Sequence, residues 1–306
     1  MIDLAKNLQI TTEATIKDSS IKDFIVLTKP SVTALVVLSS ITGMILAPGY
    51  IDPFTAIIAT IATALGSASA AVFNMWYDRD IDQLMPRTQN RPLVTKVIEQ
   101  DDAIVFCVIL GIFGLSLMAA CVNYVSSLML LCSMLFYCVI YTIWLKRSSD
   151  MNIVIGGAAG SFPPIIGWLN VCDYLTWQPI ILFLIIFFWT PAHFWALAIY
   201  RSKEYELCHV PMLPVTRGID HTKTQILIYT LLTVLFSAAP CVCNSCGIIY
   251  AISTIGLGVR FIKIAYDLKK QQGHSLAMKL FLYSIFYLFA LLISFIIDHY
   301  VFFAIT

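Results

Sequence analysis

Long apolar runs separated by short polar segments make up most of the chain. Nine runs are long enough to cross a bilayer, because the hydrocarbon layer takes about 20 residues of helix. These runs cover residues 24–47, 54–77, 103–122, 124–144, 152–169, 177–200, 224–242, 245–268 and 280–304. They are continuously apolar, whereas the strands of a membrane barrel alternate at every second position. The pattern predicts an all-α polytopic membrane protein with nine transmembrane helices.

The remaining segments predict a simple domain organisation. Residues 1–22 are polar and are expected to form an N-terminal tail, and residues 23–306 are expected to form a single membrane domain. The long apolar stretch from residue 224 to residue 268 must contain two helices. Its reversal is expected at the polar segment Cys243-Asn244-Ser245.

Charge adds an orientation to this picture. With nine spans, the N-terminus and every second connection lie on one side, and all 19 Lys and Arg residues fall there or at the adjoining helix ends. The positive-inside rule then places the N-terminus in the cytoplasm and the C-terminus on the outer, periplasmic side of a cell inner membrane. Charged residues make up only 12% of the chain, against about 25% in soluble domains. This composition excludes a soluble enzyme, a disordered protein and a nucleic-acid binder.

A column of acidic and amide side chains ends the second apolar run. Asn74, Asp78 and Asp82 are spaced at i, i+4 and i+8, so a helix places them on one face. Carboxylates next to hydrocarbon are costly and usually mark a functional site. Oxygen ligands suit Mg²⁺, which often joins carboxylates to substrate phosphates. The spacing predicts a metal site at the cytoplasmic mouth, with Asp80, which lies off the column, as a weaker candidate.

Basic side chains from three connections on the same side accompany this column. Arginine binds phosphate oxygens through two parallel hydrogen bonds, so these residues are expected to bind a diphosphate group. The alternative is that each is an ordinary interfacial cation placed by the positive-inside rule. The candidates are Arg79, Arg87, Arg91, Lys146, Arg147, Arg201 and Lys203. The sixth run also ends in acids and bases, which suggests a weak internal repeat four spans after the first.

Small and aromatic residues within the spans leave two interpretations open. Gly156 and Gly160 allow close helix packing, or they make room for a bulky lipophilic ligand. Trp189 and Trp195 pack in the core, or they offer aromatic faces that stabilise a carbocation. His193 is either a packing residue or a group that binds ligand or transfers a proton.

Three cysteines lie close together near the outer surface. The pattern Cys241-x-Cys243-x-x-Cys246 is similar to a metal cluster, but it lacks a fourth ligand nearby. Packing or a disulfide is therefore the favoured interpretation.

Seven stretches of the chain together resemble the UbiA superfamily of membrane prenyltransferases. They run from the second span to the loop after the sixth, in the order typical of the family. The stretches are Asn74-x-x-x-Asp78-Arg79-Asp80-Ile81-Asp82, Met85-x-Arg87-Thr88-x-Asn90-Arg91-Pro92, Tyr141-Thr142-x-Trp144-Leu145-Lys146-Arg147, residues 152–160, Pro163-Pro164 with Gly167-Trp168, Trp189-Thr190-Pro191-x-His193-Phe194-Trp195, and Pro211-Met212-Leu213-Pro214-Val215. The second and the last favour the branch that acts on haem over the branches that act on aromatic acids or chlorophyll.

The resemblance implies a helix bundle around a central cavity open to the cytoplasmic side. It implies Mg²⁺-dependent transfer of a farnesyl group from farnesyl diphosphate to haem b. It also implies that the protein contacts haem A synthase or oxidase assembly factors. The implied metal ligands are Asn74, Asp78, Asp82 and Glu204. The implied lining of a haem or prenyl cavity is His193, Trp189, Trp195, Gly156, Gly160 and Tyr141.

The chain departs from the family pattern at two points, and two rival functions stay open. Glu204 stands where the family usually has Asp, and Cys208-His209 replaces the usual Ala-Gly. One rival is a UbiA enzyme with a quinone or chlorophyll precursor as acceptor. The other is a transporter or a haem-handling membrane protein, although acids gathered at one mouth argue against a path through the membrane.

Overall fold

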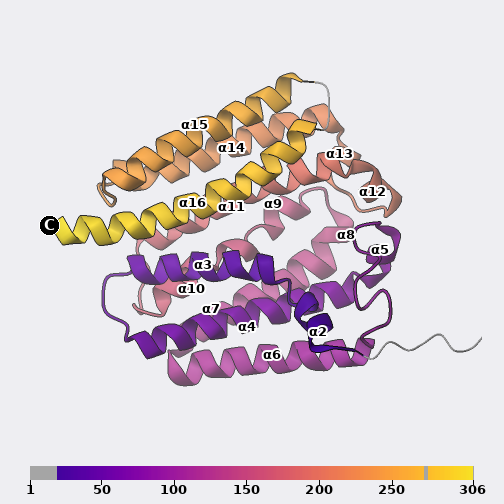
Figure 1. The fold of residues 1–306 in the computed structure, drawn as a ribbon, viewed down its shortest axis with the longest axis horizontal. Helices are drawn as coiled ribbons and strands as arrows, with labels where there is room; N and C mark the ends of the chain where they lie inside the picture. Colours follow the sequence, from indigo (N-terminus) through magenta and orange to yellow (C-terminus); the bar gives the residue numbers. More distant parts are fainter. Residues whose placement is uncertain (1–18, 272–274, 306) are drawn as a thin grey trace, which may run out of the picture.

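The computed structural model describes residues 19–271 and 275–305, and these residues form helices and connections without a strand. The long helices lie side by side in one bundle (Figure 1). Most of the predicted N-terminal tail falls on residues 1–18, outside the described residues, and its last residues belong to a helix that begins at Ile21.

The described residues contain eight helical segments that are long and apolar enough to span a membrane, or nine if a bent pair is one span. The bent pair is α2 (Ile21–Leu27) and α3 (Pro30–Leu46), which meet at 56°. The other segments are α4 (Pro53–Tyr77), α6 (Gln100–Cys121), Tyr124–Ser148, Asn152–Leu169, α11 (Trp177–Tyr200), α14 (Ile219–Val242), α15 (Ile248–Lys270) and α16 (Ser275–Ile305). The all-α membrane architecture predicted from the sequence is confirmed.

Two of these segments are not regular α-helices. Tyr124–Ser148 consists of α7 (Tyr124–Leu135), a π-helical stretch η1 (Phe136–Leu145) and α8 (Lys146–Ser148). The segment at 152–169, expected as one helix, is divided into α9 (Asn152–Gly156), a 3₁₀ turn η2 (Ala159–Ser161) and α10 (Pro163–Leu169). Proline lacks a backbone N–H, which the first helical positions do not need, so Pro163-Pro164 suits the start of α10.

The weak repeat seen in the sequence has a structural counterpart. α4 packs along α6, and α11 packs along α14. Both α4 and α11 end at a one-residue break, at Asp78 and Arg201, followed by the six-residue helices α5 (Arg79–Leu84) and α12 (Ser202–Leu207). The chain then continues to a four-residue helix α13 (Leu213–Thr216) before α14 begins.

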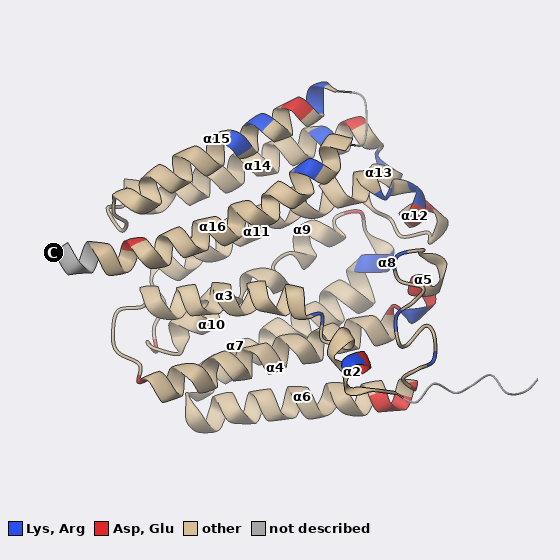
Figure 2. Cartoon of the chain, in the orientation of Figure 1, with Lys and Arg blue, Asp and Glu red and all other residues tan. Residues whose placement is uncertain are grey.

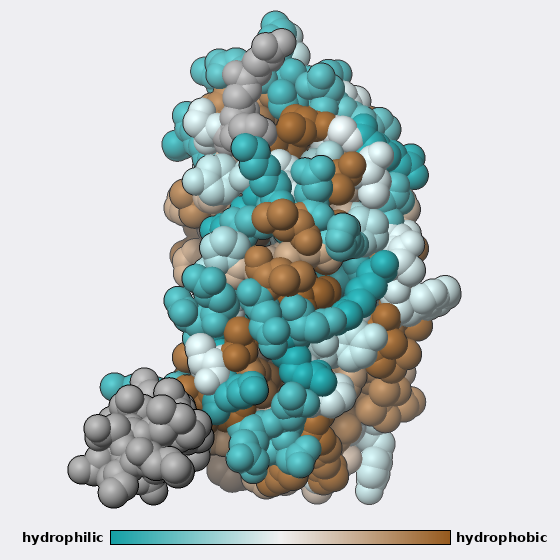
Figure 3. Space-filling model, turned by 90° about the vertical axis from the view of Figure 1, so that its right-hand side faces the viewer, coloured by the Kyte–Doolittle hydropathy of each residue, from teal (hydrophilic) through white to brown (hydrophobic). Residues whose placement is uncertain are grey.

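Charge is segregated along the bundle. The described Lys and Arg residues lie in the half that holds α5, α8, α12 and α13 (Figure 2). The space-filling view onto this end shows hydrophilic side chains spread across it, with apolar ones between them (Figure 3). The cations that the sequence assigns to one side of the membrane therefore share one half of the molecule.

Helices α3 and α10 approach each other closely at glycines. A Cβ atom on Gly167 would lie 1.8 Å from the backbone oxygen of Ser40, and one on Gly43 would lie 2.1 Å from that of Pro164. Since backbone atoms on both helices fill this space, no side-chain movement relieves the clash. Small residues at such contacts let membrane helices pack backbone to backbone.

Gly167→Ala is expected to destabilise the protein by about 1–3 kcal/mol or more, the usual cost of overpacking. The matched control is Gly256→Ala on α15, where an added Cβ meets no atom within 4 Å. The thermal midpoint of each variant in detergent measures the effect. Equal midpoints for Gly167→Ala and the unaltered protein would contradict this packing.

Candidate functional site

The acidic column lies at the end of α4 and is buried. Asp78 caps α4, with its backbone N–H donating to the oxygen of Asn74 at 3.0 Å, and the side-chain nitrogen of Asn74 donates to Asp78 Oδ2 at 2.8 Å. Asn74, Asp78 and Asp82 are 4%, 1% and 5% exposed. Asn74 and Asp78 therefore contact each other across one helical turn, and the helical break at Asp78 separates both from Asp82.

Cations from different segments balance the buried acids. Lys146 of α8 contacts Asp78 Oδ2, and Arg91 donates to Asp82 Oδ2 at 2.5 Å. Arg147 donates from two nitrogens to the two oxygens of Asp80, each at 2.7 Å. These hydrogen bonds hold the pKa of Asp80 below its ordinary value. A buried carboxylate without such a partner would cost several kcal/mol.

Lys29 completes this group, and the sequence reasoning missed it. It lies at the bend between α2 and α3 with φ at 48°, and its Nζ donates to Asn74 Oδ1 at 2.7 Å. Thr142 also contacts the same amide, accepting a hydrogen bond from Asn74 Nδ2 at 3.1 Å. A lone cation before Pro30 within an apolar run was the signal that could have identified Lys29.

The second half of the bundle contributes an acid and a base from α12 and its break. Arg201 Nη1 donates to Glu204 Oε1 at 2.6 Å. Glu204 Oε2 and Arg201 Nε are buried and have no hydrogen-bond partner among the described residues. Glu204, the residue that departs from the family pattern, therefore keeps one carboxylate oxygen unpaired near the mouth.

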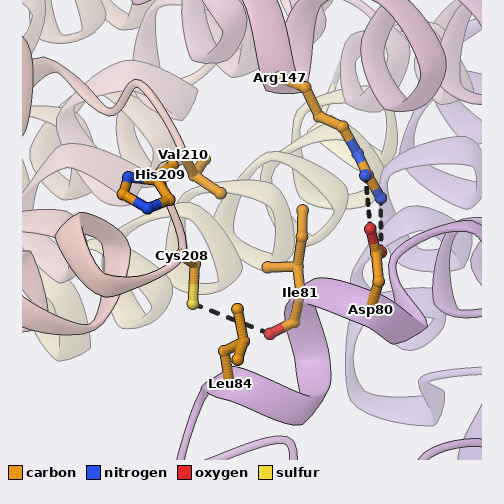
Figure 4. Close-up of a pocket in the computed structure, with 7 residues that line it drawn as sticks. All are labelled: Asp80, Ile81, Leu84, Arg147, Cys208, His209 and Val210. Carbon is orange, nitrogen blue, oxygen red and sulfur yellow. Dashed lines mark hydrogen bonds and ion pairs between the residues drawn. The ribbon is translucent and has the colours of Figure 1, made fainter.

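A cavity of about 200 Å³ separates the two halves at this mouth. One wall is formed by Asp80, Ile81, Leu84 and Arg147, and the other by residues 208–210 (Figure 4). The Cys208 thiol reaches across to the backbone oxygen of Ile81 at 3.8 Å. The volume lies below the 300–1,000 Å³ typical of pockets for drug-sized ligands, so it suits only a small group.

His209 adopts a backbone conformation that favours glycine. Its φ is 52°, in the left-handed region, where His is tolerated better than most residues. This position is the one where the family pattern has Gly, so the substitution keeps the turn at the price of some strain.

The donor set fits a hard divalent cation, although the described residues hold no group of three or more His, Cys, Asp or Glu placed to coordinate one. Each predicted ligand already has one oxygen bound to a cation or an N–H group. Two anionic oxygens, Asp78 Oδ1 and Glu204 Oε2, are buried and lack a hydrogen bond. Asp78 Oδ1 forms a longer ion pair with Arg147 Nη2, at 3.7 Å. Carboxylate oxygens without a hydrogen bond are suitable ligands for Mg²⁺.

Some of the predicted cations form ion pairs at the mouth, and the others do not. Arg91, Lys146, Arg147 and Arg201 lie within the network of ion pairs. Arg79 instead donates to the backbone oxygen of Trp76 at 2.7 Å and lies over that ring. The side chains of Arg87 and Lys203 are exposed.

The predicted lipophilic residues lie deeper in the bundle. His193 stacks between Trp189 and Phe281, and its Nδ1 lies 2.6 Å from Ser284 Oγ. Trp189 also donates to the backbone oxygen of Ser284, at 2.8 Å. These contacts join α11 to α16, so His193 has at least a packing role here.

The remaining lipophilic candidates differ in their surroundings. Trp195 is buried, with its indole N–H unpaired. A Cβ on Gly156 would lie 2.2 Å from Tyr141 Cδ2, whereas one on Gly160 meets no atom within 4 Å. Gly156 therefore accommodates the Tyr141 ring, and Gly160 borders open space.

Comparisons with known proteins agree on one family. The model of the UbiA prenyltransferase family matches residues 36–292. The protoheme IX farnesyltransferase of Orientia tsutsugamushi is 46% identical over 281 residues, which cover 92% of this chain and 90% of the relative. That of Rickettsia bellii is 47% identical over 293 residues, covering 94% and 96%.

Solved structures show the same fold. A digeranylgeranylglyceryl phosphate synthase has a TM-score of 0.76 at 20% identity, covering 91% of this chain and 98% of its own. A UbiA homolog from Archaeoglobus fulgidus bound to GPP and Mg²⁺ has a TM-score of 0.65 at 16% identity, covering 89% and 99%. The match over most of the chain shows that this multi-pass membrane protein belongs to the UbiA prenyltransferase family.

Proposed function

We propose that this protein is a protoheme IX farnesyltransferase. It transfers the farnesyl group of farnesyl diphosphate to a vinyl group of haem b, giving haem O and diphosphate. Relatives with this name are 46–48% identical over about nine tenths of the chain, which supports the choice of acceptor. The structural observation that carries the proposal is the buried column of Asn74, Asp78 and Asp82, matched by cations at one mouth.

The site residues work by exchanging partners. Asn74, Asp78 and Asp82, with Glu204 from the other half, would hold Mg²⁺. Bound there, Mg²⁺ would supply the positive charge that stabilises diphosphate as a leaving group. Arg91, Lys146, Arg147 and Arg201 now pair with acids, and they turn to phosphate oxygens when the substrate binds. Arg87 and Lys203 are exposed at the same mouth and can join them.

The acceptor reaction takes place below this charged layer. A carbon of the haem vinyl group bonds to the first carbon of the farnesyl chain, while the oxygen of diphosphate leaves with the bonding electrons. Water then adds to the other vinyl carbon and loses a proton, which gives the hydroxyethylfarnesyl side chain. We assign the lipophilic cavity to His193, Trp189, Trp195, Tyr141, Gly156 and Gly160. The apolar surroundings keep water from the cation before the new bond forms.

The proposed orientation places the site on the cytoplasmic side of a bacterial inner membrane. The N-terminus is cytoplasmic and the C-terminus is periplasmic, since the half that holds the Lys and Arg residues faces inward. Contact with haem A synthase or with oxidase assembly factors remains a prediction of the family resemblance.

The acceptor is tested with purified protein, farnesyl diphosphate and Mg²⁺, supplied with either haem b or an aromatic quinone precursor. We expect a haem product heavier by a farnesyl group and a hydroxyl group, together with released diphosphate. Mass spectrometry of the extracted products shows which acceptor has gained a prenyl group, and a chelator provides the metal-free control. Prenylation of the quinone precursor alone would support another branch, and no diphosphate release would support a non-enzymatic role.

Lys29→Met tests the residue that the sequence reasoning missed. The change removes the cation that contacts Asn74, so turnover is expected to fall about 10-fold or more, as for other preorganised charges near a leaving group. The matched control is Lys22→Met on the same bent span, where the side chain is exposed. Equal kinetics for the two variants would exclude Lys29 from the site.

A further inference from the structure

The connection between α14 and α15 folds back on itself at the end of the bundle opposite the acidic column. α14 ends at Val242, and Asn244 takes a left-handed conformation with φ at 52°. The backbone N–H of Ser245 then donates to the oxygen of Pro240 at 2.9 Å. This reversal carries Cys246 back over the last turn of α14, where Cys241 lies.

The two sulfur atoms are in direct contact. Cys246 Sγ lies 3.2 Å from Cys241 Sγ, which is about 1.2 Å longer than a disulfide bond. Cys243, the third cysteine of the motif, is exposed. We propose that Cys241 and Cys246 form a disulfide bond in the native membrane, and that Cys243 remains a free thiol.

The surrounding structure holds Cys246 in place for this bond. Asp298 of α16 is 2% exposed and accepts hydrogen bonds from three backbone N–H groups at the start of α15. They belong to Gly247, Ile249 at 2.9 Å and Tyr250 at 3.2 Å. Because Gly247 directly follows Cys246, this cap restrains the backbone on one side of the thiol.

An oxidant can reach the pair from outside. A cavity of about 540 Å³ opens at this end, and Cys246 lines it together with Asn244, Ser245, Asp298 and His299. No Lys or Arg is among the described residues that line this cavity, and the connection between α14 and α15 lies at the end of the bundle away from the Lys and Arg residues (Figure 2). The proposed orientation makes this the periplasmic face, so the inference rests on that part of the proposed function. The periplasm is an oxidising compartment in which structural disulfides persist.

The bond forms by thiol–disulfide exchange with a protein oxidant of that compartment. One thiolate attacks the disulfide of the oxidant and gives a mixed disulfide, which the second thiolate then displaces. The two thiols lose two protons and two electrons, and the oxidant leaves as a dithiol. Burial raises the pKa of the Cys246 thiol, so a smaller fraction of it is present as the thiolate that attacks the oxidant.

The test uses the full-length protein in membranes of a Gram-negative host. Free thiols are alkylated with N-ethylmaleimide at near-neutral pH while the protein is being unfolded in detergent, and the protein is then digested. We expect a peptide containing a Cys241–Cys246 bond, about 2 Da lighter than its reduced form, and alkylation at Cys243. The bond is expected to persist in Cys243→Ser and to be absent from Cys246→Ser. Complete alkylation of both Cys241 and Cys246 in the unreduced protein would overturn the proposal.

A second measurement separates the disulfide from the orientation on which it rests. A membrane-impermeant maleimide is applied to spheroplasts and to inverted vesicles, and labelling is read at Cys243 by the same digestion. Labelling in spheroplasts together with free Cys241 and Cys246 would overturn the disulfide alone. Labelling only in inverted vesicles would overturn the orientation, and the disulfide with it.

Discussion

The need to neutralise carboxylates at the edge of the hydrocarbon layer shapes this end of the molecule. Asp78 and Asp82 are almost fully buried, and an uncompensated buried charge would cost several kcal/mol. The cations paired with them come from the connection that carries Arg91 and from α8 with Lys146. The bend at Lys29 adds a third cation, which donates to the neighbouring Asn74. These segments must therefore meet where α4 ends.

This constraint explains why several helices are interrupted at the same end of the bundle. The break at Lys29 brings its ammonium group to Asn74. The breaks at Asp78 and Arg201 turn α5 and α12 away from their long helices and leave a small cavity between them. The ion pairs that hold this arrangement together are made by the same charged groups that the proposed function assigns to Mg²⁺ and diphosphate. The proposed catalysis thus uses the same groups that stabilise this end of the bundle.

Features that depend on residues close together in the chain could be predicted from the sequence. Apolar run length predicted the membrane spans, and the i, i+4 spacing of Asn74 and Asp78 predicted their contact. Contacts between residues that are far apart in the chain could not be predicted in this way. The contact of Lys29 with Asn74 joins residues 45 positions apart, and no periodicity encodes it. Arg79 illustrates the same limit, because its contact with Trp76 rather than with an acid depends on how the chain turns after α4.

The central claim is that Asp78 lies at a metal site, and the most direct test is metal binding itself. Mn²⁺ replaces Mg²⁺ and is followed by electron paramagnetic resonance in the presence of a non-cleavable farnesyl diphosphate analogue. We predict a bound Mn²⁺ signal in the unaltered protein and in Asp102→Asn, a control at an exposed acid of α6. In Asp78→Asn, with an unchanged elution profile, the bound signal should be lost. An undiminished signal in that variant would contradict the account.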